Sequence, residues 1–163
     1  MSKFRKEFIE TRDIDCFFKC NNYYLHVSTV GADLPDWINN REKIFHAYRQ
    51  VERLDNKFET EELFVNREFL THTLFANMQG KEREEAINNY LPWFINIAKK
   101  GFMSFDRTNI NDRTDTRYHL VACPKAYGMY DLNVQLMTWS FNYDNFIHYA
   151  NDRMFSTQIQ LLV

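Results

Sequence analysis

The first hydrophobic segments of the chain alternate with polar residues in the manner of strands. Residues 14–19 and 23–30 are rich in aromatic and β-branched side chains and flank Asn21 and Asn22. This pattern predicts a hairpin that turns at the two asparagines. Alternation along the second segment divides its side chains between two faces. One face carries Leu25, Val27 and Thr29, and the other carries Tyr24, His26, Ser28 and Val30.

Two helices are predicted in the middle of the chain. Apolar residues recur at helical spacing over about residues 36–54, after acidic residues and a proline that suit a helix start. The second helix begins after Gly80 with acidic residues and closes with two lysines and Gly101, which suit the helix dipole and a C-terminal cap. Pro92 lies inside it and is expected to kink or divide it. Residues 62–78 suit a short strand or a helix equally.

Strand-like alternation returns in the C-terminal half. Residues 106–117 are polar and aperiodic, and they predict a loop. Segments 117–123 and 132–139 have strand character, 143–153 suits a short helix, and 155–163 alternates again as a terminal strand. The order of elements predicts an α+β fold with a mainly antiparallel sheet covered by about three helices.

Composition favours a single domain over residues 1–163, because no repeat, linker or low-complexity tract divides the chain. The chain has 20 basic and 22 acidic residues, so it lacks the broad positive field expected of a protein that binds double-stranded nucleic acid. The sequence has no apolar run of the roughly 20 residues that a membrane-spanning helix needs. The polar N-terminus does not fit a signal peptide, so we expect a cytoplasmic protein without a membrane partner.

Several familiar chemistries find no support in the motifs. The chain lacks the glycine-rich nucleotide loops, the zincin motif and the serine-hydrolase elbow. Cys16 and Cys20, with His26 or Cys123 as further ligands, are a conceivable zinc site. However, a structural zinc site usually has a second closely spaced pair of Cys or His ligands, and the sequence has no such pair. No histidine is marked as the partner of a cysteine nucleophile. We therefore expect the cysteines to be core residues and the protein to use neither metal nor cofactor.

Two histidines in predicted strands are the remaining chemical signal. His26 and Ser28 point the same way from one strand, and His119 lies in a comparable strand setting. Two imidazoles that face each other across a groove divide acid and base work, one removing a proton from the attacking oxygen and the other protonating the leaving oxygen. Nearby hydroxyls would orient the phosphate. The alternative is that both histidines are strand residues with ordinary hydrogen bonds.

The triplet His26-Val27-Ser28 is an H-x-[ST] motif, and a second histidine triplet begins at His119 but has Val121 in the hydroxyl position. The arrangement resembles the 2H phosphoesterase superfamily, whose members carry two such strand motifs in a bilobed α+β fold and cleave phosphodiesters. The resemblance implies a metal-independent phosphodiesterase that acts on a nucleotide phosphodiester or a cyclic oligonucleotide, with His26 and His119 as its catalytic pair. Some small phage members destroy cyclic nucleotide messengers of bacterial defence.

The resemblance also gives roles to neighbouring residues. Ser28 and Arg117 would contact the phosphate of the substrate. Flat aromatic faces suit stacking on a base, and the residues that offer one are Trp139, Tyr127 and Trp37.

A competing hypothesis is a non-catalytic protein-binding or inhibitor protein, for instance a phage inhibitor of a host enzyme. Its support is the aromatic content of 17%, since aromatic residues are enriched at interfaces. The enzyme requires His26 and His119 to share one open groove, whereas a binding protein requires an exposed apolar patch. An RNA-binding module is disfavoured by the acidic balance and by the missing RNP-type motifs.

Overall fold

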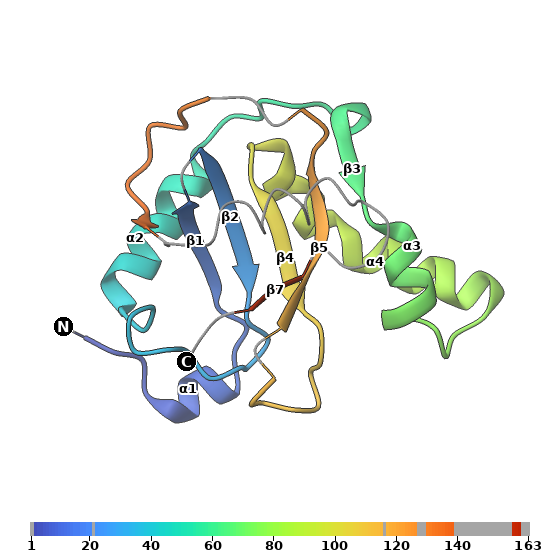
Figure 1. Cartoon of the computed structure of the whole chain (residues 1–163), viewed down its shortest axis with the longest axis horizontal. Coiled ribbons are helices and arrows are strands. Elements are labelled where there is room, and N and C mark those ends of the chain that lie inside the picture. Colours follow the sequence, from blue (N-terminus) through green and yellow to red (C-terminus); the bar gives the residue numbers. More distant parts are fainter. Residues whose placement is uncertain (1, 21, 116, 127–129, 139–157, 161–163) are drawn as a thin grey trace.

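The computed structural model describes residues 2–20, 22–115, 117–126, 130–138 and 158–160 (Figure 1). The helical elements are α1 (Lys6–Glu10), α2 (Arg41–Glu52), η1 (Thr60–Glu62), α3 (Arg67–Phe69), η2 (Leu70–Leu74) and α4 (Gly80–Lys99). The strands are β1 (Asp15–Cys20), β2 (Tyr23–Ser28), β3 (Leu63–Val65), β4 (Met103–Arg107), β5 (Arg117–Pro124), β6 (Met137–Thr138) and β7 (Gln158–Gln160).

One sheet contains all of the described strands. Its order is β3-β5-β4-β2-β1-β6, and β7 pairs with β5. The pairs β1–β2, β3–β5, β4–β5 and β5–β7 are antiparallel, whereas β2–β4 and β1–β6 are parallel. The expected α+β fold with a mainly antiparallel sheet is therefore confirmed.

The predicted N-terminal hairpin is present as β1 and β2. Its register runs from Cys20 opposite Tyr23 to Asp15 opposite Ser28. Leu25 and Val27 belong to the large apolar cluster on one face of the sheet, as the alternation predicted. The opposite face of β2 turns toward α4, where the His26 ring lies 6.1 Å from the ring of Phe94. The hairpin thus places a histidine under a helix.

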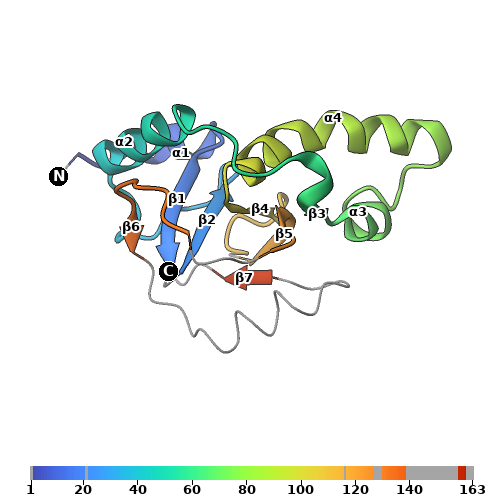
Figure 2. The same cartoon turned by 90° about the horizontal axis from the view of Figure 1, so that it is seen from above.

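Helices α2 and α4 lie on the same side of the sheet (Figure 2). Helix α2 packs through Ala47 and Val51 against Phe17 of β1. Helix α4 packs through an apolar stripe that includes Leu91 against Val121 of β5. In the part of the chain that the structure describes, no helix is both long and apolar enough to cross a membrane.

The helix boundaries differ from the expectation in two respects. Helix α2 begins at Arg41 rather than near residue 36, because the side chain of Asn40 caps it by accepting a hydrogen bond of 3.1 Å from the backbone N–H of Lys43. Helix α4 runs undivided through Pro92. Pro92 lies at an exposed position of this helix. Because proline has no backbone N–H, the hydrogen bond that this residue would donate within the helix is missing.

Strand β4 is the main element that the sequence pattern missed. It follows α4 directly and lies between β2 and β5, and its last two residues fall in the segment expected to be a loop. Segment 62–78 forms short pieces of strand and helix. Among the described residues of the expected strand 132–139, only Met137–Thr138 pairs in the sheet. The expected helix over 143–153 lies outside the described residues, and β7 is the described part of the expected terminal strand.

Candidate functional site

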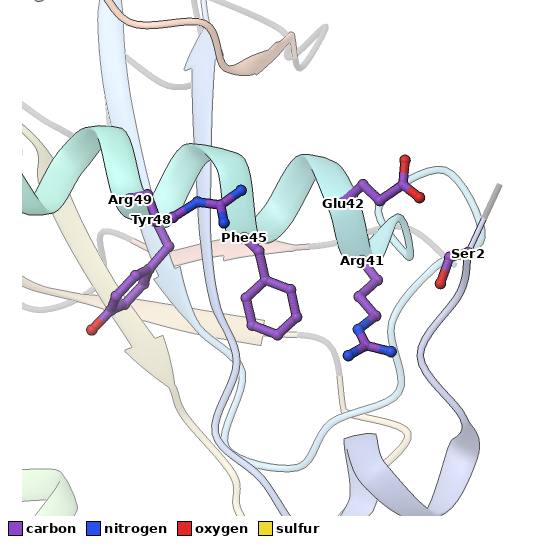
Figure 3. A pocket seen from close by; sticks show the side chains of 6 residues that line it. All are labelled: Ser2, Arg41, Glu42, Phe45, Tyr48 and Arg49. Atoms are coloured by element: carbon purple, nitrogen blue, oxygen red, sulfur yellow. The ribbon is translucent and has the colours of Figure 1, made fainter.

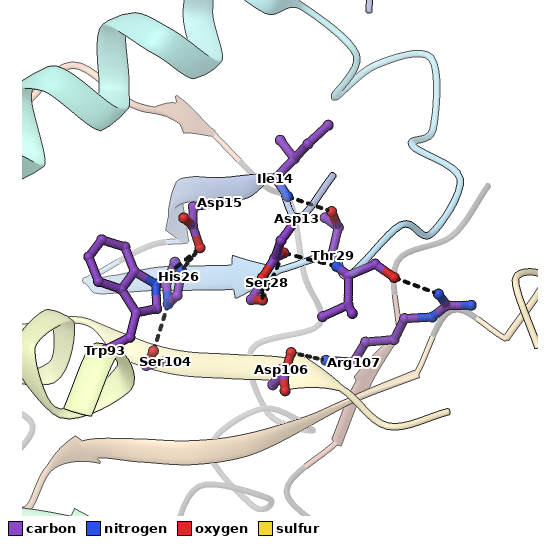
Figure 4. A network of polar contacts seen from close by, with 11 residues as sticks. Asp13, Ile14, Asp15, His26, Ser28, Thr29, Trp93, Ser104, Asp106 and Arg107 are labelled. Atoms are coloured by element: carbon purple, nitrogen blue, oxygen red, sulfur yellow. Dashed lines mark hydrogen bonds and ion pairs between the residues drawn. The ribbon is translucent and has the colours of Figure 1, made fainter. Parts of the chain in front are cut away.

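A cluster of polar side chains occupies the sheet face beneath α4. Neighbouring strands β2, β4 and β5 bring them together, since His26 pairs with Ser104, Ser28 with Asp106, and Asp106 with His119. Each of these five residues is at least nine-tenths buried. Asp13 just before β1, Asp15 at its start, and Tyr90 and Trp93 of α4 complete what we call the polar cluster. Figure 4 shows the part of it that contains Asp13, Asp15, His26, Ser28, Trp93, Ser104 and Asp106.

His26 lies in the interior and uses both ring nitrogens. Its Nδ1 atom is 2.6 Å from Ser104 Oγ, and its Nε2 atom is 2.8 Å from Asp15 Oδ1. Phe17 stacks on the ring at a centroid distance of 5.0 Å. A serine, an imidazole and a carboxylate in series have the connectivity of a nucleophile, its base and an orienting acid. Neither His26 nor Ser104 has any exposed surface, so this series is closed to a substrate.

His119 is buried against Phe69, whose ring stacks on it at 4.7 Å. Its Nε2 atom lies 3.4 Å from the Tyr90 hydroxyl, and its Nδ1 atom lies 3.4 Å from the Thr108 hydroxyl. Burial lowers the pKa of His119 to about 3. The ring is therefore neutral at physiological pH and does not carry the proton that a general acid must donate.

Asp106 is the buried carboxylate between the two histidine strands. It accepts a hydrogen bond of 2.8 Å from the backbone N–H of Arg107, and burial raises its pKa to about 6. Ser28 donates to the Asp13 carboxylate at 2.9 Å, so its hydroxyl is already engaged. The cluster is an internally satisfied network.

The structure brings together three of the seven residues that the sequence singled out: His26, Ser28 and His119 share the polar cluster. Arg117 is exposed at the start of β5, where its guanidinium pairs with Asp115 at 2.5 Å. Trp37 packs on Phe18, which belongs to the apolar cluster on the opposite face of the sheet. Trp139 and Tyr127 lie outside the described residues.

Several members of the cluster were not anticipated. The sequence did not single out Ser104 and Asp106, because β4 was not predicted. The apolar residues that follow Gly101, Phe102 and Met103, were the available signal for that strand. Tyr90 and Trp93 lie on a predicted helix, but helical periodicity does not say which sheet residues a helix will cover.

A second feature is a hollowed surface on α1 and α2. Figure 3 shows Arg41, Phe45 and Tyr48 projecting from one side of α2, beside a cavity of about 390 Å³. A neighbouring cavity of about 370 Å³ shares Arg41 and reaches Phe8 of α1. We define the arginine–aromatic surface by the arginine and partly exposed aromatic residues along both cavities and their cationic neighbour: Arg5, Phe8, Arg12, Arg41, Phe45, Tyr48 and Arg49. Ser2, Lys3, Phe4 and Glu42 line the same cavities.

Aromatic rings and guanidinium groups are paired on this surface. Buried Phe4 stacks on Phe8 at 5.1 Å and meets Phe45 edge-on at 5.6 Å. Phe8 and Phe45 themselves remain 40% and 41% exposed. Arg12 lies 5.7 Å from the Phe8 ring centroid, and Arg41 lies 5.6 Å from that of Phe45.

The four arginines of this surface have no acidic partner among the residues that the structure describes. Among the described residues, no carboxylate lies within 4.0 Å of the guanidinium of Arg5, Arg12, Arg41 or Arg49. Their positive charges are thus not neutralised by ion pairs with the part of the chain that the structure describes.

Comparison with known proteins gives no further guide, since no family model, no curated protein and no solved structure matches the chain. Within the described ranges, no group of three or more His, Cys, Asp or Glu side chains is arranged to hold a metal ion.

Proposed function

We propose that this chain is a non-catalytic binding protein whose arginine–aromatic surface captures an acidic segment of another protein. One observation carries the proposal: Phe8 and Phe45, whose rings both contact Phe4, stay exposed, each with an arginine over its ring. Aromatic residues and arginine are the side chains most enriched in the energetically dominant parts of interfaces.

The hydrophobic effect supplies the first reason for a partner here. Fully burying one phenylalanine contributes about 1.5–3 kcal/mol. Phe8 and Phe45 are still 40% and 41% exposed, so a partner that covers them would gain a large part of that free energy. Phe4 beneath them holds both rings in place, so little side-chain entropy is lost when they are covered.

Charge supplies the second reason. Arginines without carboxylate neighbours raise the local potential, and an acidic segment would both neutralise them and be steered toward them. A protein segment is favoured over a nucleic acid because the whole chain has a net charge of −2 and no broad positive field.

Phosphodiesterase activity has less support from the geometry. An enzyme of the two-histidine type needs both imidazoles open to one phosphate, whereas His26 and His119 are buried and have strand β4 between them. That activity stays a prediction, as does a cytoplasmic location.

The test is a binding titration with a designed probe. A fluorescent peptide in which glutamates are interspersed with leucine and phenylalanine should bind the wild-type protein saturably, and binding should weaken as salt is added. Phe45→Ala should weaken binding about tenfold. Ile110→Ala is the matched control, because Ile110 is 57% exposed in the loop after β4 and lines neither cavity of the arginine–aromatic surface.

Two results would overturn the proposal. One is equal binding of the peptide by the wild type and by Phe45→Ala. The other is tighter binding of single-stranded oligothymidylate than of the acidic peptide, which would make the surface a nucleic-acid site.

A further inference from the structure

A separate cavity lies between α2 and α4, on the helical side of the sheet. Its volume is about 220 Å³, below the roughly 300 Å³ at which sites for drug-sized ligands begin. Its walls include Phe17, Tyr48, Glu52, Trp93, Asn96 and Lys100. We infer that this cavity binds a planar nitrogen heteroaromatic ring of nucleobase size, held between Tyr48 and Trp93.

The two aromatic walls are nearly parallel. The rings of Tyr48 and Trp93 are inclined by only 22°, and their centroids are 6.4 Å apart. A flat ring in van der Waals contact with both faces needs about 7 Å between the two ring planes, so Trp93 moves outward to admit it. Trp93 is 36% exposed, so its outer side has room for that movement. Buried Phe17, whose ring lies edge-on to Tyr48, closes the inner end.

The polar cluster holds Trp93 in position. The indole N–H donates to Asp15 Oδ1 at 3.3 Å, and the same oxygen lies 2.8 Å from His26 Nε2. His26 is held in turn by Ser104. This chain of hydrogen bonds orients the indole beside the cavity when no ligand is bound.

The polar groups in the wall suit the edge of a base that carries an amino group. Glu52 lines the cavity together with Tyr48, and burial together with the Glu52 carboxylate raises the pKa of Tyr48. Glu52 accepts hydrogen bonds, and the Asn96 amide both accepts and donates. Adenine, cytosine and guanine carry an exocyclic amino group with two N–H donors, which suits the two acceptors of Glu52 and Asn96, whereas uracil offers only the single N3–H.

A cation in the same cavity is disfavoured. Three aromatic rings and a carboxylate also describe an aromatic cage for a quaternary ammonium group. However, the Lys100 ammonium lines the cavity, where it donates to the backbone carbonyls of Glu52 and Leu54. A second positive charge would be repelled, and nearly parallel rings enclose a flat ligand better than a spherical one.

Calorimetric titration of the full chain with adenosine, guanosine, cytidine, uridine and choline tests the inference. At least one amino-bearing nucleoside should bind saturably, in the micromolar to millimolar range, and more tightly than uridine or choline. Trp93→Ala and Tyr48→Ala should each weaken that binding about tenfold or more, while Ile110→Ala should not. Thermal unfolding of each variant checks that it is folded.

A second readout does not depend on variants. In the wild-type protein, addition of the bound nucleoside should shift the NMR resonance of the Trp93 indole N–H, assigned by its loss in Trp93→Ala. The inference is overturned if no nucleoside binds, if Trp93→Ala binds as the wild type does, or if choline is the tightest ligand. Trp93→Ala separates this inference from binding of the acidic peptide, because Trp93 does not belong to the arginine–aromatic surface, whereas Tyr48 lines cavities of both.

Discussion

The hydroxyl of Tyr90 on α4 donates a hydrogen bond of 2.5 Å to the carboxylate of Asp106 on β4, and Asp106 is almost completely shielded from water. Burial raises the pKa of Asp106 from its ordinary value of 3.8 to about 6. Between these values the folded protein keeps a proton that the unfolded chain releases. The stability contributed by that proton is complete below about pH 4 and is lost as the pH rises through about 6.

Replacing Asp106 with asparagine should remove this dependence. Relative to the wild type, the free energy of unfolding of Asp106→Asn should rise by up to about 3 kcal/mol between acidic and neutral pH, since each pKa unit corresponds to about 1.4 kcal/mol. Urea unfolding at a series of pH values measures it. The exposed Asp55→Asn is the control and should follow the wild type. Parallel pH profiles for Asp106→Asn and the wild type would refute the assignment.

His119 should produce the opposite dependence. Its folded pKa of about 3 lies below the ordinary 6.5, so its contribution to stability is complete above about pH 6.5 and is lost as the pH falls toward 3. His119→Gln is neutral throughout, and it should lose less stability than the wild type on acidification, by about 1.4 kcal/mol per pH unit in that window. An unchanged acid limb would show that His119 is not buried as a neutral ring.

Two glycines with positive φ offer a matched pair of substitutions. A Cβ at Gly101, where φ is +106°, would lie 2.8 Å from a ring carbon of Tyr130, whereas a Cβ at Gly80, where φ is +54°, has no atom within 4 Å. Gly101→Ala should therefore cost backbone strain and a clash, about 2–4 kcal/mol, and Gly80→Ala strain alone, about 1 kcal/mol. Equal losses in thermal unfolding would contradict this account of Gly101.

Much of the framework was predictable because local patterns determine it. The hairpin around Asn21-Asn22 and the two long helices each have their own periodicity and end signals. Strand β4 was missed because a short, wholly buried strand does not alternate. Because β4 was not predicted, Ser104 and Asp106 were not recognised as members of the cluster. The burial of His26 and His119 beneath α4 was not predicted either. Burial by a distant helix is a tertiary property that two histidine triplets do not encode.

The two histidines also give a direct test of catalysis. If the polar cluster is structural, the wild-type protein should show no turnover of 2′,3′-cyclic phosphates, linear dinucleotides or cyclic dinucleotides that depends on His26 or His119. The expected effect of His26→Ala is instead a loss of stability of about 1–3 kcal/mol, because Asp15 and Ser104 each lose a partner. Turnover by the wild type that disappears in both His26→Ala and His119→Ala would establish a phosphodiesterase.

The central claim concerns the arginine–aromatic surface, and reversal of its charge tests it most directly. The measurement compares the affinity of wild type and Arg41→Glu for two peptides of the same pattern, one acidic and one with lysine in place of glutamate. We expect the wild type to prefer the acidic peptide and Arg41→Glu to lose about tenfold in affinity for it while gaining for the basic peptide. An unchanged preference in Arg41→Glu would contradict the assignment of this surface as the binding site.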